Sequence, residues 1–252
     1  KLIHERKNYI VRKSVNLSKQ TQIIASNIDL AFLLITINNP PTHTTFIDRF
    51  LVTAQAYSIK VILVFNKIDT YQIEERAEIL YLKDIYETIG YTCVEVSAKE
   101  NTNVAAIKDL MKEKTSMFSG HSGVGKTTLV NAIDATLDLK TKEISDQHRQ
   151  GKHTTTFAEM HKLEFGAYVI DTPGIRSFGL IDLEKEHLSH YFPEFRNRMA
   201  DCKFHNCMHL KEPGCAVTAA VHSGAIHRQR YDHYVSMLAE NDDDPYRRNK
   251  HA

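Results

Sequence analysis

The chain has 252 residues, of which 42% are hydrophobic and 25% charged, with 10 glycines and 6 prolines. This composition is typical of one or two globular domains and excludes a collagen-like, low-complexity or largely disordered chain. The formal net charge of +1 does not by itself indicate a nucleic-acid partner.

The sequence lacks the roughly 20 consecutive apolar residues of a membrane-spanning helix. Its longest apolar run, residues 30–37, contains a threonine and ends before Asn38. The basic N-terminus continues into polar residues instead of the apolar core of a secretory signal. We therefore expect a cytoplasmic protein with no membrane partner.

Residues 1–27 stand apart because they carry six basic residues and one acidic residue. This balance suits a patch that faces phosphates, and it suits a solvated terminal segment equally well. A short extended segment cannot bury a sheet face alone, so we expect these residues to be the end of a larger element.

The next elements alternate between two kinds. Apolar, β-rich runs predict strands at residues 30–37, 61–65, 93–96, 116–118 and 168–170. Apolar residues at three- and four-residue spacing predict helices at residues 46–57, 73–89, 103–111 and 127–135. This alternation predicts an α/β fold with a doubly wound, mostly parallel sheet over residues 28–176. A Cys/His cluster and a helical stretch at 219–238 predict a small helical second domain over 177–252.

The segment after the fourth predicted strand fits the phosphate-loop pattern G-x-x-x-x-G-K-[ST] at every fixed position. Its backbone N–H groups can face phosphates, Lys126 can reach the β- and γ-phosphates, and the Thr127 hydroxyl can bind Mg²⁺. The predicted nucleotide-binding residues of this loop and the following turn are Gly120, His121, Ser122, Gly123, Val124, Gly125, Lys126, Thr127 and Thr128.

Three further motifs follow predicted strands, where open α/β sheets bind ligands. Asn66, Lys67 and Asp69 form N-K-I-D, in which the carboxylate can accept both N–H donors of guanine, whereas adenine would oppose it with an acceptor. A second motif, made of Ser97, Ala98 and Lys99, can complete the base pocket through a backbone N–H. The third is D-T-P-G, in which Asp171 would hold Mg²⁺ and Gly174 would meet the γ-phosphate.

The order of these motifs is unusual, because N-K-I-D and S-A-K precede the phosphate loop. The domain is therefore expected to be circularly permuted. On these motifs, on G-K-H-T-T-T at 151–156 and on the later Cys/His cluster, the chain resembles the circularly permuted GTPases, and among them the bacterial RsgA family, also called YjeQ.

The resemblance implies an N-terminal OB-fold, the permuted GTPase domain and a C-terminal zinc domain, with a role in late maturation of the small ribosomal subunit through its rRNA. Residues 1–27 are too few for a five-stranded barrel, so they are expected to be a remnant of that OB-fold with its linker. We expect a monomer that hydrolyses GTP to GDP and phosphate.

The residue after D-T-P-G is Ile175, which cannot orient a water, so another group must do so. The polar stretch 145–156 is the expected switch segment. Thr155 is the preferred second Mg²⁺ ligand, with Thr154 and Thr156 as alternatives. The resemblance implies that His153 is the catalytic residue.

Three of the four cysteines crowd into fourteen residues, in the order Cys202, Cys207, His209, Cys215. In a cytoplasmic chain this set favours one structural zinc ion over disulfides, with His205 as a less favoured fourth ligand. Cys93, on an apolar strand, is interpreted as a buried small side chain.

Two other functions are compatible with parts of the sequence. One is a P-loop ATPase or nucleotide kinase, which N-K-I-D disfavours; the other is a zinc-dependent RNA-binding module with a vestigial nucleotide site. One more segment could face RNA or be a solvated helix face: His227, Arg228, Arg230, Tyr231 and Tyr234.

Overall fold

The computed structural model of the chain describes residues 5–13, 21–137, 159–171 and 184–240. The chain divides into two compact units, Lys1–Asp182 and Leu183–Ala252. The domain boundary expected at 176/177 lies outside the described residues, as does the whole switch segment 145–156.

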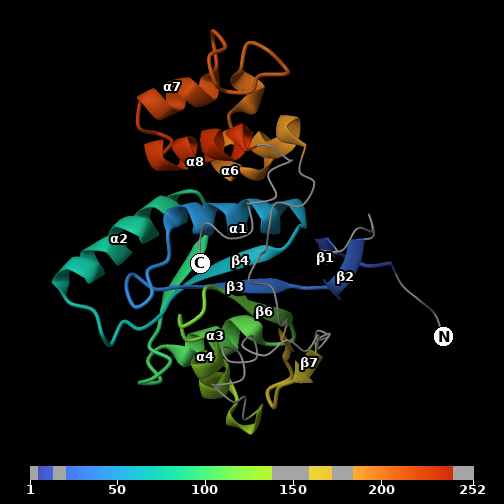
Figure 1. Cartoon of the computed structure of the whole chain (residues 1–252), viewed down its shortest axis with the longest axis vertical. Helices are drawn as coiled ribbons and strands as arrows, with labels where there is room; N and C mark the ends of the chain where they lie inside the picture. The colour runs from blue at the N-terminus through green and yellow to red at the C-terminus, as the bar shows by residue number, and fades with distance from the viewer. Residues whose placement is uncertain (1–4, 14–20, 138–158, 172–183, 241–252) are drawn as a thin grey trace, which may run out of the picture. The chain divides into compact units, whose positions relative to one another are not determined.

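The first unit is built on a six-stranded sheet in the order β5-β4-β3-β6-β8-β7 (Figure 1). Its strands are β3 (Leu30–Ile35), β4 (Lys60–Phe65), β5 (Thr92–Glu95), β6 (Thr115–Ser119), β7 (Glu159–Lys162) and β8 (Tyr168–Asp171). Neighbouring strands run parallel except for β7, which is antiparallel to β8. The mostly parallel sheet predicted from the sequence is confirmed. The edge strand β7 was not predicted, because it has only four residues and its only apolar residue is a methionine.

Helices cover both faces of this sheet. They are α1 (Thr44–Ala56), α2 (Ile73–Thr88), α3 (Val104–Met111) and α4 (Lys126–Ile133), with a short 3₁₀ turn at Ala135–Leu137. Every residue of β3 is buried. Its alternate side chains enter two separate cores, one shared with α1 and α2 and the other with α3 and α4. Figure 1 shows these helix pairs on opposite sides of β3, which confirms the doubly wound arrangement.

Residues before the sheet form an antiparallel pair, β1 (Tyr9–Lys13) with β2 (Thr21–Ser26). The Asn8 side chain donates to the Ile28 carbonyl and accepts from the Ile28 N–H, both at 2.8 Å. Ile10 is buried in the core under α1 and α2. This hairpin therefore packs as part of the first unit.

The second unit is helical. Its elements are η2 (Lys185–Tyr191), α6 (Pro193–Arg196), η3 (Met199–Asp201), α7 (Ala216–His222) and α8 (Arg228–Ala239). The single helical stretch expected at 219–238 is wrong, because Gly224 takes a left-handed conformation (φ +78°) that ends α7 and starts a turn before α8.

The core of this unit corrects one further interpretation. Phe192 stacks on Phe195 with ring centroids 4.9 Å apart, and Tyr234 meets both rings edge to face at 5.5 and 5.0 Å. Arg230 is buried beside them and forms an ion pair with Glu194 at 2.7 Å. Arg230 and Tyr234 therefore cannot form an RNA-binding face, because both side chains are inside the unit.

Within the part of the chain that the structure describes, no helix has both the length and the hydropathy needed to span a membrane.

Candidate functional site

The motif loops meet at one edge of the sheet. N-K-I-D follows β4, S-A-K follows β5 and the phosphate loop follows β6. These strands and the intervening β3 run parallel, so their carboxyl ends face the same way. This is the edge at which doubly wound sheets bind ligands. Asn66 and Val124, which are 58 residues apart in the chain, thus become neighbours.

The lysine of the phosphate loop is hydrogen-bonded to the backbone of the same loop. The Lys126 ammonium donates to the carbonyl oxygens of Gly120 and His121, both at 2.6 Å. Thr127 and Thr128 follow in the first turn of α4, whose N-terminus adds positive potential at the loop. The loop therefore presents a cation and helix N–H groups toward the same space, which suits an anionic ligand.

Asn66 joins this loop to the two base-recognition motifs. Its buried carboxamide donates to the Val124 carbonyl at 2.8 Å and accepts from the Ala98 N–H at 3.1 Å. Gly125 passes so close that a Cβ there would collide with Asn66 Nδ2. The Ala98 N–H of the S-A-K motif is therefore hydrogen-bonded to Asn66 in this structure.

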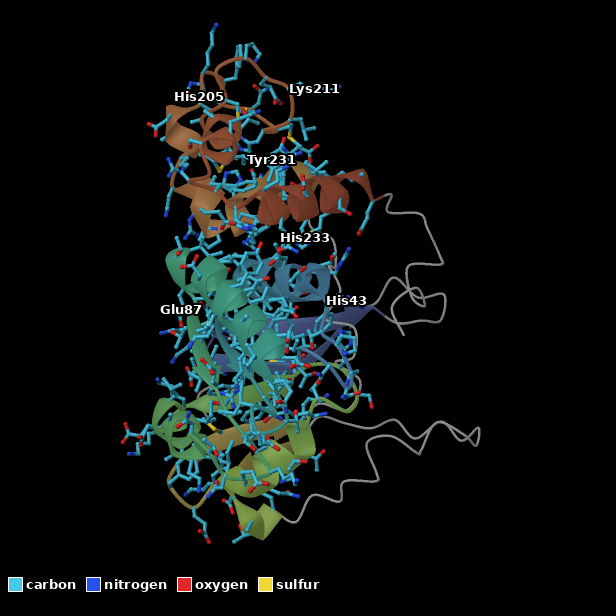
Figure 2. All side chains as sticks on the ribbon, turned by 90° about the vertical axis from the view of Figure 1, so that its left-hand side faces the viewer. His43, Glu87, His205, Lys211, Tyr231 and His233 are labelled. Atoms are coloured by element: carbon cyan, nitrogen blue, oxygen red, sulfur yellow. The ribbon has the colours of Figure 1, made fainter. Side chains whose placement is uncertain are left out.

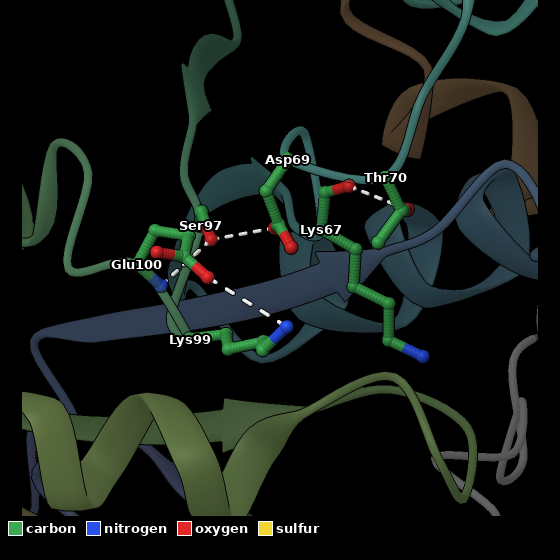
Figure 3. Close-up of polar contacts among 6 residues, drawn as sticks. All are labelled: Lys67, Asp69, Thr70, Ser97, Lys99 and Glu100. Carbon is green, nitrogen blue, oxygen red and sulfur yellow. Dashed lines mark hydrogen bonds and ion pairs between the residues drawn. The ribbon is translucent and has the colours of Figure 1, made fainter.

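The Asp69 carboxylate lies at the open edge of the site (Figure 3). One oxygen accepts a hydrogen bond of 2.5 Å from the Ser97 hydroxyl, which itself accepts from the Glu100 N–H at 3.0 Å. This fixes the carboxylate while leaving it exposed. The ion pair between Lys99 and Glu100 is largely exposed, so it contributes little stability.

Lys67 points away from Asp69 (Figure 3) and donates to the Asn39 carbonyl at 2.5 Å. Partial burial lowers the pKa of Lys67, against the opposing effect of the Asp69 carboxylate. Its backbone is left-handed (φ 68°). The lysine thereby connects N-K-I-D to the loop that follows β3.

That loop, residues 36–43, is a wall of the site that sequence reasoning missed. A Cβ on Gly123 would lie 3.3 Å from Pro40 Cδ, so the loop packs directly against the phosphate loop. Beyond it, Phe46 in the first turn of α1 stacks on His121, with ring centroids 4.0 Å apart. The only sequence signal was the turn-forming run N-N-P-P after a buried strand.

Tyr71 is a second residue that the motifs did not reveal. Its buried hydroxyl accepts from the Ile37 N–H at 3.0 Å and donates to the Asn66 carbonyl at 2.8 Å. It therefore holds the Asn66 backbone, whereas the phosphate loop bonds to the Asn66 side chain.

Replacing this tyrosine tests that support. Tyr71→Phe removes the partner of a buried carbonyl and of a partly buried N–H, at a cost of about 1–3 kcal/mol. We expect GDP to dissociate roughly tenfold faster, measured by stopped-flow release of fluorescent GDP. Tyr81→Phe, at an exposed position of α2, is the control and should release GDP at the wild-type rate. An unchanged rate for Tyr71→Phe would refute the role.

The remaining predicted nucleotide and magnesium residues are only partly described. Asp171 ends β8, which runs parallel beside β6, so its backbone lies at the motif edge. His153, Thr155 and Gly174 lie outside the described residues.

In the second unit the four predicted metal ligands converge. The ligand atoms of Cys202, Cys207, His209 and Cys215 all lie within 4.8 Å of one another. His209 Nδ1 is 3.4 Å from Cys215 Sγ and 3.7 Å from Cys202 Sγ. Tetrahedral zinc with bonds of about 2.0–2.3 Å separates its ligand atoms by about 3.5–3.8 Å, so the donors fit zinc in chemistry and in spacing. His205 is exposed and lies outside this cluster (Figure 2).

The surrounding residues orient these ligands. The Tyr231 hydroxyl donates to the His209 carbonyl and the Tyr234 hydroxyl to the Met208 carbonyl, both at 2.8 Å. The Glu212 carboxylate accepts three backbone N–H groups of the loop that carries His209. Such outer partners fix ligand geometry in metal sites.

The two buried thiols of the cluster differ in pKa. Burial raises the pKa of the Cys207 thiol to about 12, so the protein alone does not stabilise its thiolate. Burial acts in the same direction on Cys215, but hydrogen bonds from Thr218 outweigh it and lower the pKa of that thiol. All four cysteines of the chain are free of disulfides, as the zinc hypothesis requires.

A doubly wound sheet whose phosphate loop is preceded in the chain by its guanine-recognition motifs defines a circularly permuted P-loop GTPase. The chain belongs to the RsgA GTPase family, whose sequence profile matches residues 3–181. It is therefore a GTPase, and the family predicted from the motifs is confirmed.

Two relatives illustrate the similarity. The protein of Christiangramia forsetii is 60% identical over 247 residues, which cover 98% of this chain and 78% of that protein. The protein of Flavobacterium psychrophilum is 61% identical over 245 residues, covering 97% and 75%. Both are named small ribosomal subunit biogenesis GTPase RsgA.

Two solved structures resemble this chain in fold. YjeQ of Thermotoga maritima superposes with a TM-score of 0.77 at 35% identity, covering 94% of this chain and 76% of that one. YloQ, described as a circularly permuted GTPase, gives 0.76 at 34% identity, covering 94% and 72%. The permuted α/β fold class is confirmed, and the alternative of an ATPase or nucleotide kinase is set aside.

Proposed function

We propose that this GTPase hydrolyses GTP to GDP and phosphate in a Mg²⁺-dependent reaction that accompanies late maturation of the small ribosomal subunit, which it contacts through rRNA in the cytoplasm. The observation that carries the guanine-nucleotide part is the Asn66 carboxamide, which joins a phosphate loop to two base-recognition loops. The names of its relatives support the ribosomal part.

Guanine recognition is assigned to the exposed Asp69 carboxylate, since it can accept both N–H donors of the base. Lys67 and the S-A-K residues Ser97, Ala98 and Lys99 would complete the base site. Lys126 would exchange the carbonyls of Gly120 and His121 for phosphate oxygens, which are stronger partners for an ammonium group.

Magnesium, when bound, neutralises charge on the phosphate oxygens. We assign its protein contacts to the hydroxyls of Thr127 and Thr155 and to Asp171. The Thr127 position in the first turn of α4 suits this role, because its hydroxyl follows directly on the phosphate-loop lysine. Gly174 would meet the γ-phosphate, and His153 would hold the attacking water, since a neutral imidazole can accept its proton.

The second unit is assigned one structural zinc ion, held by Cys202, Cys207, His209 and Cys215. Four protein donors leave no open position for a substrate, so this site would stabilise the fold and do no chemistry. We propose a monomer with three parts: an OB-fold remnant and linker at 1–27, the GTPase domain at 28–176 and the zinc domain at 177–252.

The deciding experiment is GTP turnover with and without purified small ribosomal subunits. We expect strong stimulation of the wild type, and for His153→Ala at least a tenfold loss of stimulated turnover with unchanged GTP affinity, because general-base catalysis typically contributes 10²–10⁴-fold. No stimulation of the wild type would contradict the ribosomal role. Wild-type turnover by His153→Ala would contradict only the catalytic assignment.

A further inference from the structure

Helix α2 has two apolar faces. One packs on the sheet and buries Ile79, Leu82, Ile85 and Tyr86. On the opposite side, Ile73, Leu80 and Tyr81 are 82%, 65% and 52% exposed. Their spacing of seven and eight residues places them in one stripe along the helix, with the small side chain of Ala77 between them. A solvated helix face normally carries polar residues there, so this stripe has the composition of a contact surface.

The stripe is set among acidic side chains. Four exposed carboxylates lie on α2, at Glu74, Glu78, Asp84 and Glu87. Figure 2 labels Glu87, on the outer side of the helix. The four carboxylates outnumber the two basic residues of α2, Arg76 and Lys83. Arg76 donates to the carbonyls of Ile68 and Tyr71, at 3.1 and 3.3 Å, and Lys83 pairs with Glu95 at 2.7 Å.

The acidic charge around this stripe indicates which kind of partner would bind there. Negative potential repels the phosphates of RNA and attracts lysine and arginine. Exposed Ile and Leu favour apolar side chains, which a protein supplies and a phosphate backbone does not. We propose that the outer face of α2 is a docking site for a basic, apolar protein segment. On the function proposed above, that segment belongs to a protein of the small ribosomal subunit.

The test compares two ligands with full-length protein: purified small ribosomal subunits and protein-free small-subunit rRNA. Ile73→Ser combined with Leu80→Ser should bind subunits roughly tenfold more weakly, because apolar anchors dominate such interfaces. Its affinity for rRNA and its unstimulated GTP turnover should equal those of the wild type. Met160→Ser, which changes an exposed apolar residue on β7, is the control and should alter neither affinity.

Charge reversal gives a second, independent measurement. Glu74→Lys combined with Glu78→Lys should weaken subunit binding at low salt, whereas Glu113→Lys, at an exposed position after α3, should not. If the partner were RNA, the same reversal would strengthen binding, and that result would overturn the proposal.

Three other results would also overturn it. Light scattering that shows a wild-type dimer broken by Ile73→Ser with Leu80→Ser would assign the stripe to a second copy of this chain. Subunit binding by the wild type with unaffected α2 variants would refute the docking site alone. Failure of the wild type to bind subunits at all would refute the ribosomal function together with it.

Discussion

Replacing Cys207 with serine is expected to abolish metal binding by the Cys/His cluster and to unfold the second unit. The cluster segment around residues 202–215 contains few large apolar side chains, so metal binding must supply much of its folding free energy. Structural zinc sites contribute about 10–16 kcal/mol of apparent binding free energy, far above the marginal stability of a small domain. We expect zinc content to fall from one ion per chain to none and the region after residue 183 to become protease-sensitive, while GTP binding persists.

Cys93→Ser is the matched control, because Cys93 lies on β5 in the other unit, outside the metal cluster. It should keep its zinc and its protease resistance. Elemental analysis that finds no zinc in wild-type protein with an intact second unit would contradict the assignment.

Asp69→Asn will exchange guanine preference for xanthine preference. The amide keeps an oxygen for the Ser97 hydroxyl, so the loop should retain its conformation. It can no longer accept both guanine donors, and its NH₂ group can instead donate to the 2-oxo group of xanthine. We expect GTP affinity to fall by roughly a hundredfold or more and XTP affinity to rise, measured by calorimetric titration.

The control is Asp109→Asn, at an exposed aspartate on α3 that pairs with Lys112. It removes the same charge without touching the motif edge, so its nucleotide affinities should match the wild type. Asp69→Asn with undiminished GTP affinity would show that another group reads the base.

The sequence predicted the parallel strands of the sheet and the motif loops, because each leaves a local signal. Buried parallel strands such as β3 and β4 are continuous apolar runs, and the phosphate loop has fixed residue types at fixed spacing. The metal cluster was predicted for the same reason, because its four donors lie within fourteen residues.

What could not be predicted depends on partners far away in the chain. Tyr71 matters because its hydroxyl meets Ile37, 34 residues earlier. Arg230 was interpreted as a surface residue, yet Glu194, 36 residues before it, neutralises its charge and Phe192 lies under its guanidinium group. Arginine is rarely buried, so its residue type predicts an exposed side chain. A buried ion pair of this kind becomes visible only in the folded structure.

The permuted strand order also has a consequence for synthesis. One edge of β3 pairs with β4, which follows soon after it, but the other edge pairs with β6, whose first residue comes 80 residues after the end of β3. At roughly 5–20 residues per second, a ribosome needs several seconds to deliver that partner. Throughout that interval the emerging chain holds an apolar strand with one open edge, the kind of surface on which chains aggregate. The second edge of β3 is therefore completed only after the phosphate-loop half of the domain has been synthesised.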